Sequence, residues 1–327
     1  NNTVGATTKL GALSVSGTTT FNAGAVSVDT TNSNGGTGNQ TYSGLVTLND
    51  NEALTASGAG TIALNGGLTG NGKTLTISAQ TAVNSGDGLG ADSLTGLSTV
   101  DVTSTGGISI KASAIDSSGA SQRYRNAVTL GSNDVPNSSK TLTASTVTFD
   151  NTVNATTAGA QSLVVAGDTV FNNTVGATTK LGALSVSGNS YLNGGVVTTL
   201  GPQTYSGDVI LGADTTLTGV DLTFSSTVNS DGTNRSLKIV NSGTITFNDA
   251  VGGTIDGEEL TSISVTGGGM TKILGGSITT IEAQTYTDAI VLGADTTLSG
   301  SSIIFEKTVD ATNQGKESLV IDGDAVF

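Results

Sequence analysis

Along the chain, apolar and polar side chains alternate over short segments, and glycine, asparagine, aspartate or serine separates one segment from the next. A period of two places successive side chains on opposite faces of a β-strand. No stretch repeats apolar residues at the spacing of a helix face, so the sequence predicts an all-β fold with almost no helix. The clearest alternating pairs are Leu222/Phe224, Leu237/Ile239, Ile245/Phe247, Ile263/Val265, Ile303/Phe305 and Leu319/Ile321.

The chain repeats itself along its length. Residues 1–17 recur without change at 172–188. A Gln-x-Tyr motif occurs four times at nearly even spacing, with its tyrosines at Tyr42, Tyr124, Tyr205 and Tyr286. Self-similarity at a fixed period is typical of repeat architectures. We therefore place four repeats of similar length at 1–79, 80–171, 172–247 and 248–327.

Both ends of the chain fit the same repeat. Phe171 is followed directly by the second copy of the repeated segment, and Phe327 closes a run very similar to the one that ends at Phe171. We therefore expect residues 1–327 to form one continuous β-solenoid that is an in-phase excerpt of a longer array.

Two β architectures are compatible with repeats of this length: a β-solenoid and a row of tandem β-sandwich domains. A sandwich closes its own core, commonly around large aromatic residues, whereas a solenoid coil stacks its side chains on those of the next coil. The aromatic content of 4% and the absence of tryptophan favour the solenoid. With about 20 residues in each coil, the chain would hold about sixteen coils. Glycine and asparagine suit the corners, because both tolerate positive φ and asparagine side chains can form ladders between coils.

Composition narrows the chemistry that the chain can perform. It contains no cysteine and no histidine, which excludes thiolate zinc sites, cysteine nucleophiles, imidazole bases and Ser-His-Asp triads. The formal net charge of −14 argues against nucleic acid and anionic lipid as partners. No apolar run is long enough for membrane insertion. We expect no catalytic, cofactor-binding or metal-binding residues, and no cofactor.

Two acidic segments are candidates for sites. Asp249, Asp256, Glu258 and Glu259 form the densest acidic stretch, and paired carboxylates hydrolyse polysaccharides in glycosidases. Residues 85–92 resemble one calcium-binding nonapeptide, with Asp87 and Asp92 as oxygen ligands. The first segment lacks aromatic platforms, so we interpret it as a solvated turn. The second lacks a following copy, so we interpret it as a glycine-rich corner.

Two further features have a structural interpretation as well. Arg123 and Arg125 form a small basic spot, which we interpret as an exposed strand edge. Threonine tracts at 18–20, 215–216 and 296–297 could line an ice-binding face. Threonine also suits a half-buried pleated surface, and the repeat is too irregular internally for one threonine row per coil.

Three phrases of the sequence resemble a known family. They are LGADTTLTGVDLTFSSTVN at 211–229, SLKIVNSGTITFN at 236–248 and VGATTKLGALSVSG at 175–188. Runs of this kind resemble the β-strand repeat arrays of filamentous-haemagglutinin-type adhesins, which are very large bacterial surface proteins. The resemblance implies a right-handed parallel β-helix that is exported to the cell surface and serves as a stalk, fibre or adhesin.

The sequence therefore predicts a non-enzymatic structural segment of an extracellular bacterial fibre, acting as a rigid stalk or as a filament of a biofilm matrix. The expected partners are neighbouring repeats of the same chain and, through end-to-end or lateral self-association, further copies of the chain. One alternative is an adhesive module that binds a surface glycan or a host receptor protein. A polysaccharide-degrading β-helix enzyme is a third interpretation.

Overall fold

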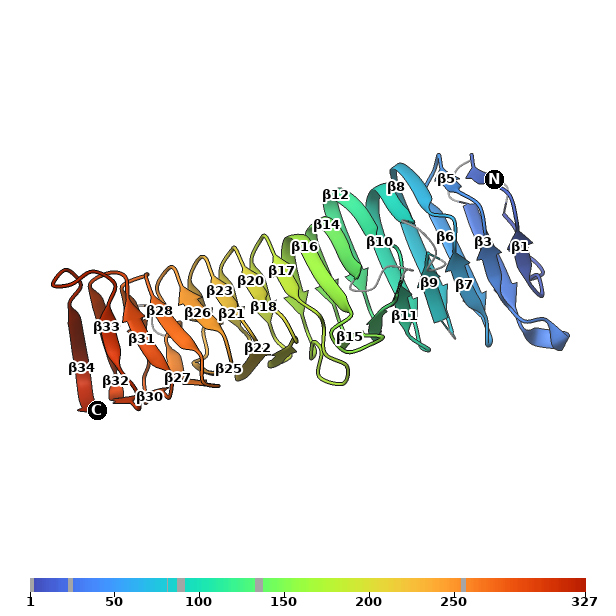
Figure 1. The fold of residues 1–327 in the computed structure, drawn as a ribbon. Helices are drawn as coiled ribbons and strands as arrows, with labels where there is room; N and C mark the ends of the chain where they lie inside the picture. Colours follow the sequence, from blue (N-terminus) through green and yellow to red (C-terminus); the bar gives the residue numbers. More distant parts are fainter. Residues whose placement is uncertain (1–2, 23–25, 81, 87–91, 133–137, 254–256) are drawn as a thin grey trace. The chain divides into compact units, whose positions relative to one another are not determined.

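A computed structural model describes residues 3–22, 26–80, 82–86, 92–132, 138–253 and 257–327 (Figure 1). It is an all-β fold whose parallel strands stack as a right-handed β-helix, or β-solenoid, of about 13 turns. The fold class predicted from the sequence is thus confirmed, and the tandem-sandwich alternative is wrong. The one helical segment in the described part of the chain is the short 3-10 turn η1 (Ser33–Gly35). No helix formed by these residues is long and apolar enough to cross a membrane.

The chain divides into two compact units, Asn1–Gly167 and Asp168–Phe327. In each unit, one turn contributes a strand to each of three parallel sheets, and a strand pairs with the equivalent strand of the next turn. Where two consecutive faces are joined without a break, one long bent strand belongs to two sheets. The strand β8, for example, pairs with β5 through Leu68 and with β6 through Leu75.

The first unit has three sheets, which we number 1 to 3. Sheet 1 contains β1 (Leu13–Val15), β4 (Gln40–Tyr42), β7 (Thr61–Leu64), β9 (Ala82–Ser85), β11 (Ile108–Ile110), β13 (Val128–Leu130) and β15 (Val153–Ala155). Sheet 2 contains β2 (Thr19–Phe21), β5 (Val46–Leu48) and the first halves of β8 (Leu68–Ala79), β10 (Ser93–Ser104), β12 (Ala114–Tyr124) and β14 (Ser138–Phe149). Sheet 3 contains β3 (Val26–Thr31), β6 (Glu52–Ser57) and the second halves of those four strands.

The second unit has sheets 4 to 6, and the strand β16 (Gln161–Phe171) enters it. Sheet 4 contains β17 (Leu184–Val186), β20 (Gln203–Tyr205), β23 (Leu222–Phe224), β26 (Thr244–Phe247), β28 (Met270–Ile273), β31 (Ala289–Leu292) and β33 (Val309–Ala311). Sheet 5 contains β18 (Ser190–Leu192), β21 (Val209–Leu211), β24 (Val228–Ser230), the bridge residue Val251, β29 (Ser277–Thr279) and the first halves of β32 (Thr296–Phe305) and β34 (Leu319–Val326). Sheet 6 contains β19 (Val196–Thr198), β22 (Thr215–Gly219), β25 (Arg235–Asn241), β27 (Leu260–Thr266), β30 (Gln284–Tyr286) and the second halves of β32 and β34.

The turns are unequal in length, and the expectation of about sixteen coils was wrong. Leu184 pairs with Gln203, nineteen positions later, whereas Leu13 pairs with Gln40, twenty-seven positions later. Corner loops and register shifts account for the extra residues. Longer turns reduce the number of coils to about 13.

The sequence repeat is out of phase with the turn of the solenoid. In the second unit, Tyr205 lies in sheet 4, whereas Tyr286, its equivalent in the next repeat, lies in sheet 6. From β20, which carries Tyr205, the chain makes three full turns to reach β28. It then passes through β29 in sheet 5 before it reaches β30, which carries Tyr286, in sheet 6. The first unit shows the same step, since Tyr42 lies in sheet 1 and Tyr124 in sheet 3. Equivalent residues of successive repeats within a unit therefore face different directions.

The core lies between the three sheets of each unit and is filled by the inward positions of the alternating pattern. Both members of the pairs around Phe224, Ile239, Phe247, Val265 and Phe305 are buried, as predicted, and Leu319 and Ile321 are half-buried. The aromatic rings stack from turn to turn. The centroid of Phe224 lies 5.4 Å from that of Tyr205 and 5.1 Å from that of Phe247, with nearly parallel planes.

Glycine and asparagine occupy the corners, as predicted. Gly176 has φ +67°, and a Cβ on it would lie 2.0 Å from the carbonyl oxygen of Thr198. Its counterpart in the first copy of the repeated segment, Gly5, is in the same position against Asp29. Asparagine side chains form ladders between turns: Asn49 donates to Asn22 over 2.6 Å, and Asn193 donates to Asn172 over 2.8 Å. A further rung joins Asn71 to Asn49, over 3.0 Å.

Candidate functional site

The most regular feature of the interior is a hydrogen-bonded pair of side chains at each Gln-x-Tyr motif. Period two turns both side chains of the motif inward, so glutamine and tyrosine meet in the core. The tyrosine hydroxyl donates to the glutamine Oε1, and the glutamine Nε2 donates to backbone carbonyls. We call this arrangement the Gln–Tyr clamp. Its four copies are Gln40/Tyr42, Gln122/Tyr124, Gln203/Tyr205 and Gln284/Tyr286, and all eight side chains are buried.

Each clamp holds backbone beyond its own strand. In the fourth copy, Gln284 Nε2 donates to the carbonyl oxygen of Ile278, over 2.9 Å, and to that of Ser299, over 2.8 Å. Ile278 precedes the motif and Ser299 follows it, and the two strands are paired through Ile278 and Leu298 in sheet 5. The clamp therefore ties two consecutive turns together from inside the core.

The first two copies have the same geometry, and in the third copy a threonine hydroxyl replaces one of the two carbonyl oxygens. Gln40 donates to the carbonyl oxygens of Val28 and Thr55, both over 2.8 Å. Gln122 donates to Ile115 over 2.8 Å and to Thr143 over 3.0 Å. Gln203 donates to the carbonyl oxygen of Thr218 over 2.8 Å and to Thr199 Oγ1 over 3.2 Å. In each copy, one side chain thus bridges two segments about a turn apart.

Because these polar pairs are buried, burial affects both the pKa of the tyrosines and the energetic cost of losing a partner. Desolvation raises the pKa of Tyr124, Tyr205 and Tyr286 above the ordinary value of 10.0, so the hydroxyls stay protonated and act as donors. A buried polar group that loses its partner costs about 1–3 kcal/mol. The clamp therefore stabilises the fold only in the register that supplies all of its partners.

Two strands after each clamp, the four repeats have an equivalent position at which the residue type differs. It is Glu52 in the first repeat, Lys140 in the second, and Thr215 and Thr296 in the third and fourth. All four side chains are buried. The threonine hydroxyls are satisfied locally, by the carbonyl oxygens of Ala213 and Ala294.

The two charged residues at this position have shifted pKa values. Burial, with a smaller contribution from Asp50, raises the pKa of Glu52 from 4.5 to about 8, and neither of its carboxylate oxygens has a hydrogen-bond partner among the described residues. Burial lowers the pKa of Lys140 from 10.5 to about 8, and its Nζ donates to the carbonyl oxygen of Lys111 over 2.7 Å. These groups lie in the core rather than in an open cleft.

The acidic stretch considered for polysaccharide hydrolysis is used mainly to fix local backbone. Asp249 accepts from the backbone of Ala250 over 2.7 Å, and Glu259 accepts from the backbone of Gly257 over 2.9 Å. Glu258 lines a surface hollow. Asp256 lies outside the described residues.

The segment considered for calcium lies largely outside the described residues, because 87–91 and therefore Asp87 are not among them. At its ends, the Ser85 side chain is buried, and the carbonyl oxygen of Asp92 accepts from Ser113 N over 2.8 Å and from Ser113 Oγ over 2.9 Å. Across the described part of the chain, no group of three or more possible ligand side chains is close enough to hold a metal ion.

The basic spot is engaged in ion pairs between turns. Arg123 contacts Asp150 over 2.8 Å, and Arg125 contacts Asp101 over 2.6 Å. All four side chains are exposed or partly exposed, and such pairs contribute at most about 1 kcal/mol each. The arginines are solvent-exposed, as interpreted from the sequence, but Arg123 lies on β12, which is paired on both sides, so it does not lie at a strand edge.

The threonine tracts at 215–216 and 296–297 do not form a flat outer row. Thr215 points into the core and Thr216 points outward, and the same is true of Thr296 and Thr297. Alternation thus divides each of these tracts between the core and the surface.

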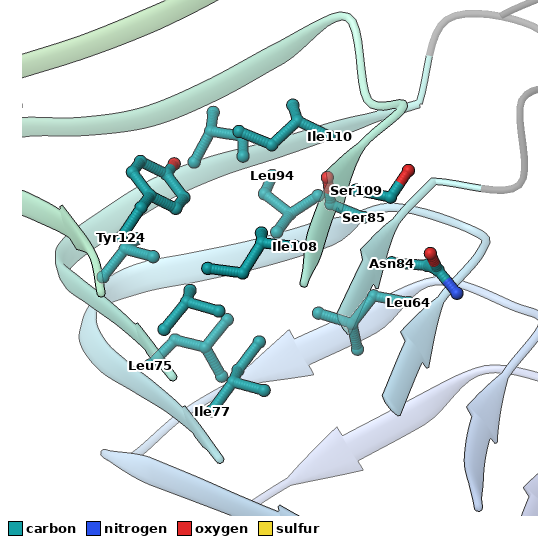
Figure 2. Close-up of a pocket in the computed structure, with 13 residues that line it drawn as sticks. Leu64, Leu75, Ile77, Asn84, Ser85, Leu94, Ile108, Ser109, Ile110 and Tyr124 are labelled. Atoms are coloured by element: carbon teal, nitrogen blue, oxygen red, sulfur yellow. The ribbon is translucent and has the colours of Figure 1, made fainter. Parts of the chain in front are cut away.

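A small cavity lies inside the first unit (Figure 2). Its volume is about 20 Å³, and its lining includes Leu64, Leu75, Ile108 and Tyr124. Ligand pockets measure roughly 300–1,000 Å³, so this cavity is a packing gap of the core.

No protein-family model, curated protein or solved structure matches the chain. The sequence pattern marked the Gln-x-Tyr motif as a repeat signature, and the clamp that the motif forms was not predicted. The signal that could have found it is the glutamine two positions before each tyrosine, because a period of two directs both side chains into the same core.

Proposed function

We propose that this chain is a structural, non-enzymatic repeat segment of an extracellular bacterial fibre or adhesin, in which the solenoid serves as a rigid stalk or matrix filament. The observation that carries the proposal is the recurrence of the Gln–Tyr clamp in all four sequence repeats. Polar groups buried at this depth are costly unless every partner is supplied. Their repeated use indicates a chain built for cohesion between successive turns.

The backbone supports the same role. Its strands pair in parallel and join one turn to the next, as from β20 to β23 and from β21 to β24. In such an architecture stability is approximately a sum over neighbouring repeats. Length can then be added without a new core, which is what a stalk requires. The resemblance to filamentous-haemagglutinin-type repeats supports the extracellular location.

Surface labelling and an activity assay test the proposal together. Antibodies raised against the chain should label intact source cells, and labelling confined to permeabilised cells would refute the extracellular role. The purified chain should release no reducing ends from a panel of bacterial and plant polysaccharides. Release that disappears in a Glu258→Gln variant would replace the structural role with an enzymatic one.

A further inference from the structure

A hollow of about 610 Å³ lies on the outer surface of the second unit. Its floor follows three outward-facing residues of sheet 5 that are direct neighbours in register: Tyr191 pairs with Ile210, and Ile210 pairs with Asn229. Neighbouring strands lie about 4.8 Å apart, so these side chains form a short strip that changes from aromatic to aliphatic to amide. The volume is within the range of small-molecule sites, roughly 300–1,000 Å³.

Tyr191 differs from the other tyrosines of the chain. The four tyrosines of the clamps are at most 1% exposed, whereas Tyr191 is 37% exposed. Its strand, β18, is paired on both sides, so Tyr191 lies in register between Val170 and Ile210. An amphipathic ring with two rotatable bonds offers contact area at low entropic cost.

Carboxylates border this strip. Asp208, Asp231 and Glu258 line the hollow. Asp208 accepts from Ser226 Oγ, and from Thr227 Oγ1 over 2.9 Å, and these hydrogen bonds lower its pKa. Asp231 is held by Arg235 over 3.2 Å. Asp208 is therefore oriented by hydroxyl donors, and Asp231 is oriented and partly neutralised by Arg235. Both retain acceptor capacity, since each ionised carboxylate offers about four acceptor positions.

We infer that the hollow around Tyr191 binds a neutral oligosaccharide, with one pyranose ring lying on the Tyr191–Ile210 strip and its hydroxyl groups donating to the bordering carboxylates. A sugar ring presents an apolar C–H face and a rim of hydroxyl donors, which matches an aromatic floor edged by acceptors. Asn229 adds an amide that can both donate and accept. Acidic sugars are disfavoured by the carboxylates and by the net charge of −14.

The chain contains its own comparison for this hollow. The equivalent strip in the next sequence repeat is Lys272, Val291 and Asp310, which pair in the same order in sheet 4. It has the same backbone arrangement but no aromatic residue. Binding is therefore assigned to the Tyr191 strip alone.

The inference does not depend on the stalk proposal, because it concerns the outer surface and not the clamps. To test it, the full chain is titrated with cellotetraose, maltotetraose and chitotetraose. Binding of each probe is measured by saturation-transfer NMR and by calorimetry. Tetragalacturonate and tetralysine serve as acidic and basic probes. At least one neutral probe should bind, and neither charged probe should bind more tightly.

Substitutions then place the binding in the hollow. Tyr191→Ala should weaken binding of the neutral probe about tenfold or more, equivalent to about 1.4 kcal/mol, whereas Tyr191→Phe should keep most of the affinity because the ring face remains. Lys272→Ala, on the equivalent strip, should leave binding unchanged. Circular dichroism confirms that each variant is folded.

Three results would overturn the inference. They are the absence of binding to any neutral probe at millimolar concentration, binding that Tyr191→Ala leaves intact, and tighter binding of tetralysine that Tyr191→Ala abolishes, which would make the hollow a site for cationic peptides. None of these results would alter the stalk proposal.

Discussion

Replacing Gln203 with leucine removes one Gln–Tyr clamp while keeping a side chain of similar size in the core. The substitution removes the hydrogen bonds from Gln203 Nε2 to the carbonyl oxygen of Thr218, over 2.8 Å, and to Thr199 Oγ1, over 3.2 Å. The Tyr205 hydroxyl loses its acceptor, 2.9 Å away, and no longer has a partner in the core. The perturbation is therefore confined to the turns that this clamp joins.

The cost follows from the groups left behind. The carbonyl oxygen of Thr218 still accepts from the backbone of Thr199 over 2.9 Å, and the Thr199 hydroxyl still donates to Gly201 over 2.7 Å. The main penalty is thus the stranded hydroxyl of Tyr205, which costs about 1–3 kcal/mol, together with about 1 kcal/mol for each hydrogen bond lost. We expect Gln203→Leu to destabilise this part of the second unit by about 3–5 kcal/mol.

Native-state hydrogen exchange is the appropriate assay, because solenoids open locally rather than as one two-state domain. Amides of β20, β22 and β23 should exchange about 150-fold faster or more in Gln203→Leu. The double variant Gln203→Leu/Tyr205→Phe also removes the stranded hydroxyl. The stability lost in the double variant should be smaller, by about 1–3 kcal/mol, than the sum of the stabilities lost in the two single variants. The matched control is Thr204→Ala, at the outward position of the same strand.

Exchange rates in Gln203→Leu within about twofold of the parent chain would refute this reasoning, because a loss of more than about 1 kcal/mol must show as a larger change. Strict additivity of the double variant would refute it as well, since it would mean that Gln203 and Tyr205 do not stabilise each other.

Three further predictions concern the corners and the buried charges. Gly176→Ala should destabilise the second unit by about 2 kcal/mol or more in chemical denaturation, because the added Cβ would clash with the Thr198 carbonyl oxygen at a positive φ. The control Gly17→Ala should leave stability unchanged, because a Cβ at Gly17 would contact no other atom. Glu52 has a raised pKa, so its contribution to stability is fully present below pH 4.5 and is lost as the pH rises to about 8. Glu52→Gln should remove that decline in pH-dependent denaturation, and an unchanged profile would contradict the assignment. Lys140 has a lowered pKa, so its contribution is present above pH 10.5 and is lost as the pH falls to about 8. Lys140→Met should abolish the rise in stability between those values, and persistence of the rise would show that another group causes it.

Much of the architecture follows from the period of two in the sequence. Pairs such as Leu222/Phe224 alternate in a way that only a strand satisfies, and both side chains are buried in β23. The low aromatic content correctly favoured stacking between coils over separate sandwich cores. The turn length was not predictable in the same way, because corner loops vary freely at the surface, as the difference between the Leu184 and Leu13 registers shows.

The phase between repeat and turn also escaped prediction. The sequence shows that Tyr205 and Tyr286 are equivalent, but only the strand pairings show that they belong to different sheets. The hollow at Tyr191 could not be found from the sequence for a related reason. Its floor combines β18, β21 and β24, and which residues become neighbours depends on the exact length of each turn.

The central claim is that the clamps fasten each turn to the next, and pulling a single molecule tests it most directly. Optical tweezers attached at the two ends of the chain should unravel it in steps, and Gln203→Leu and Gln284→Leu should each lower the force of the step at their own turn. Unchanged forces in both variants would contradict the claim, because cohesion between turns would then reside in the backbone ladder alone.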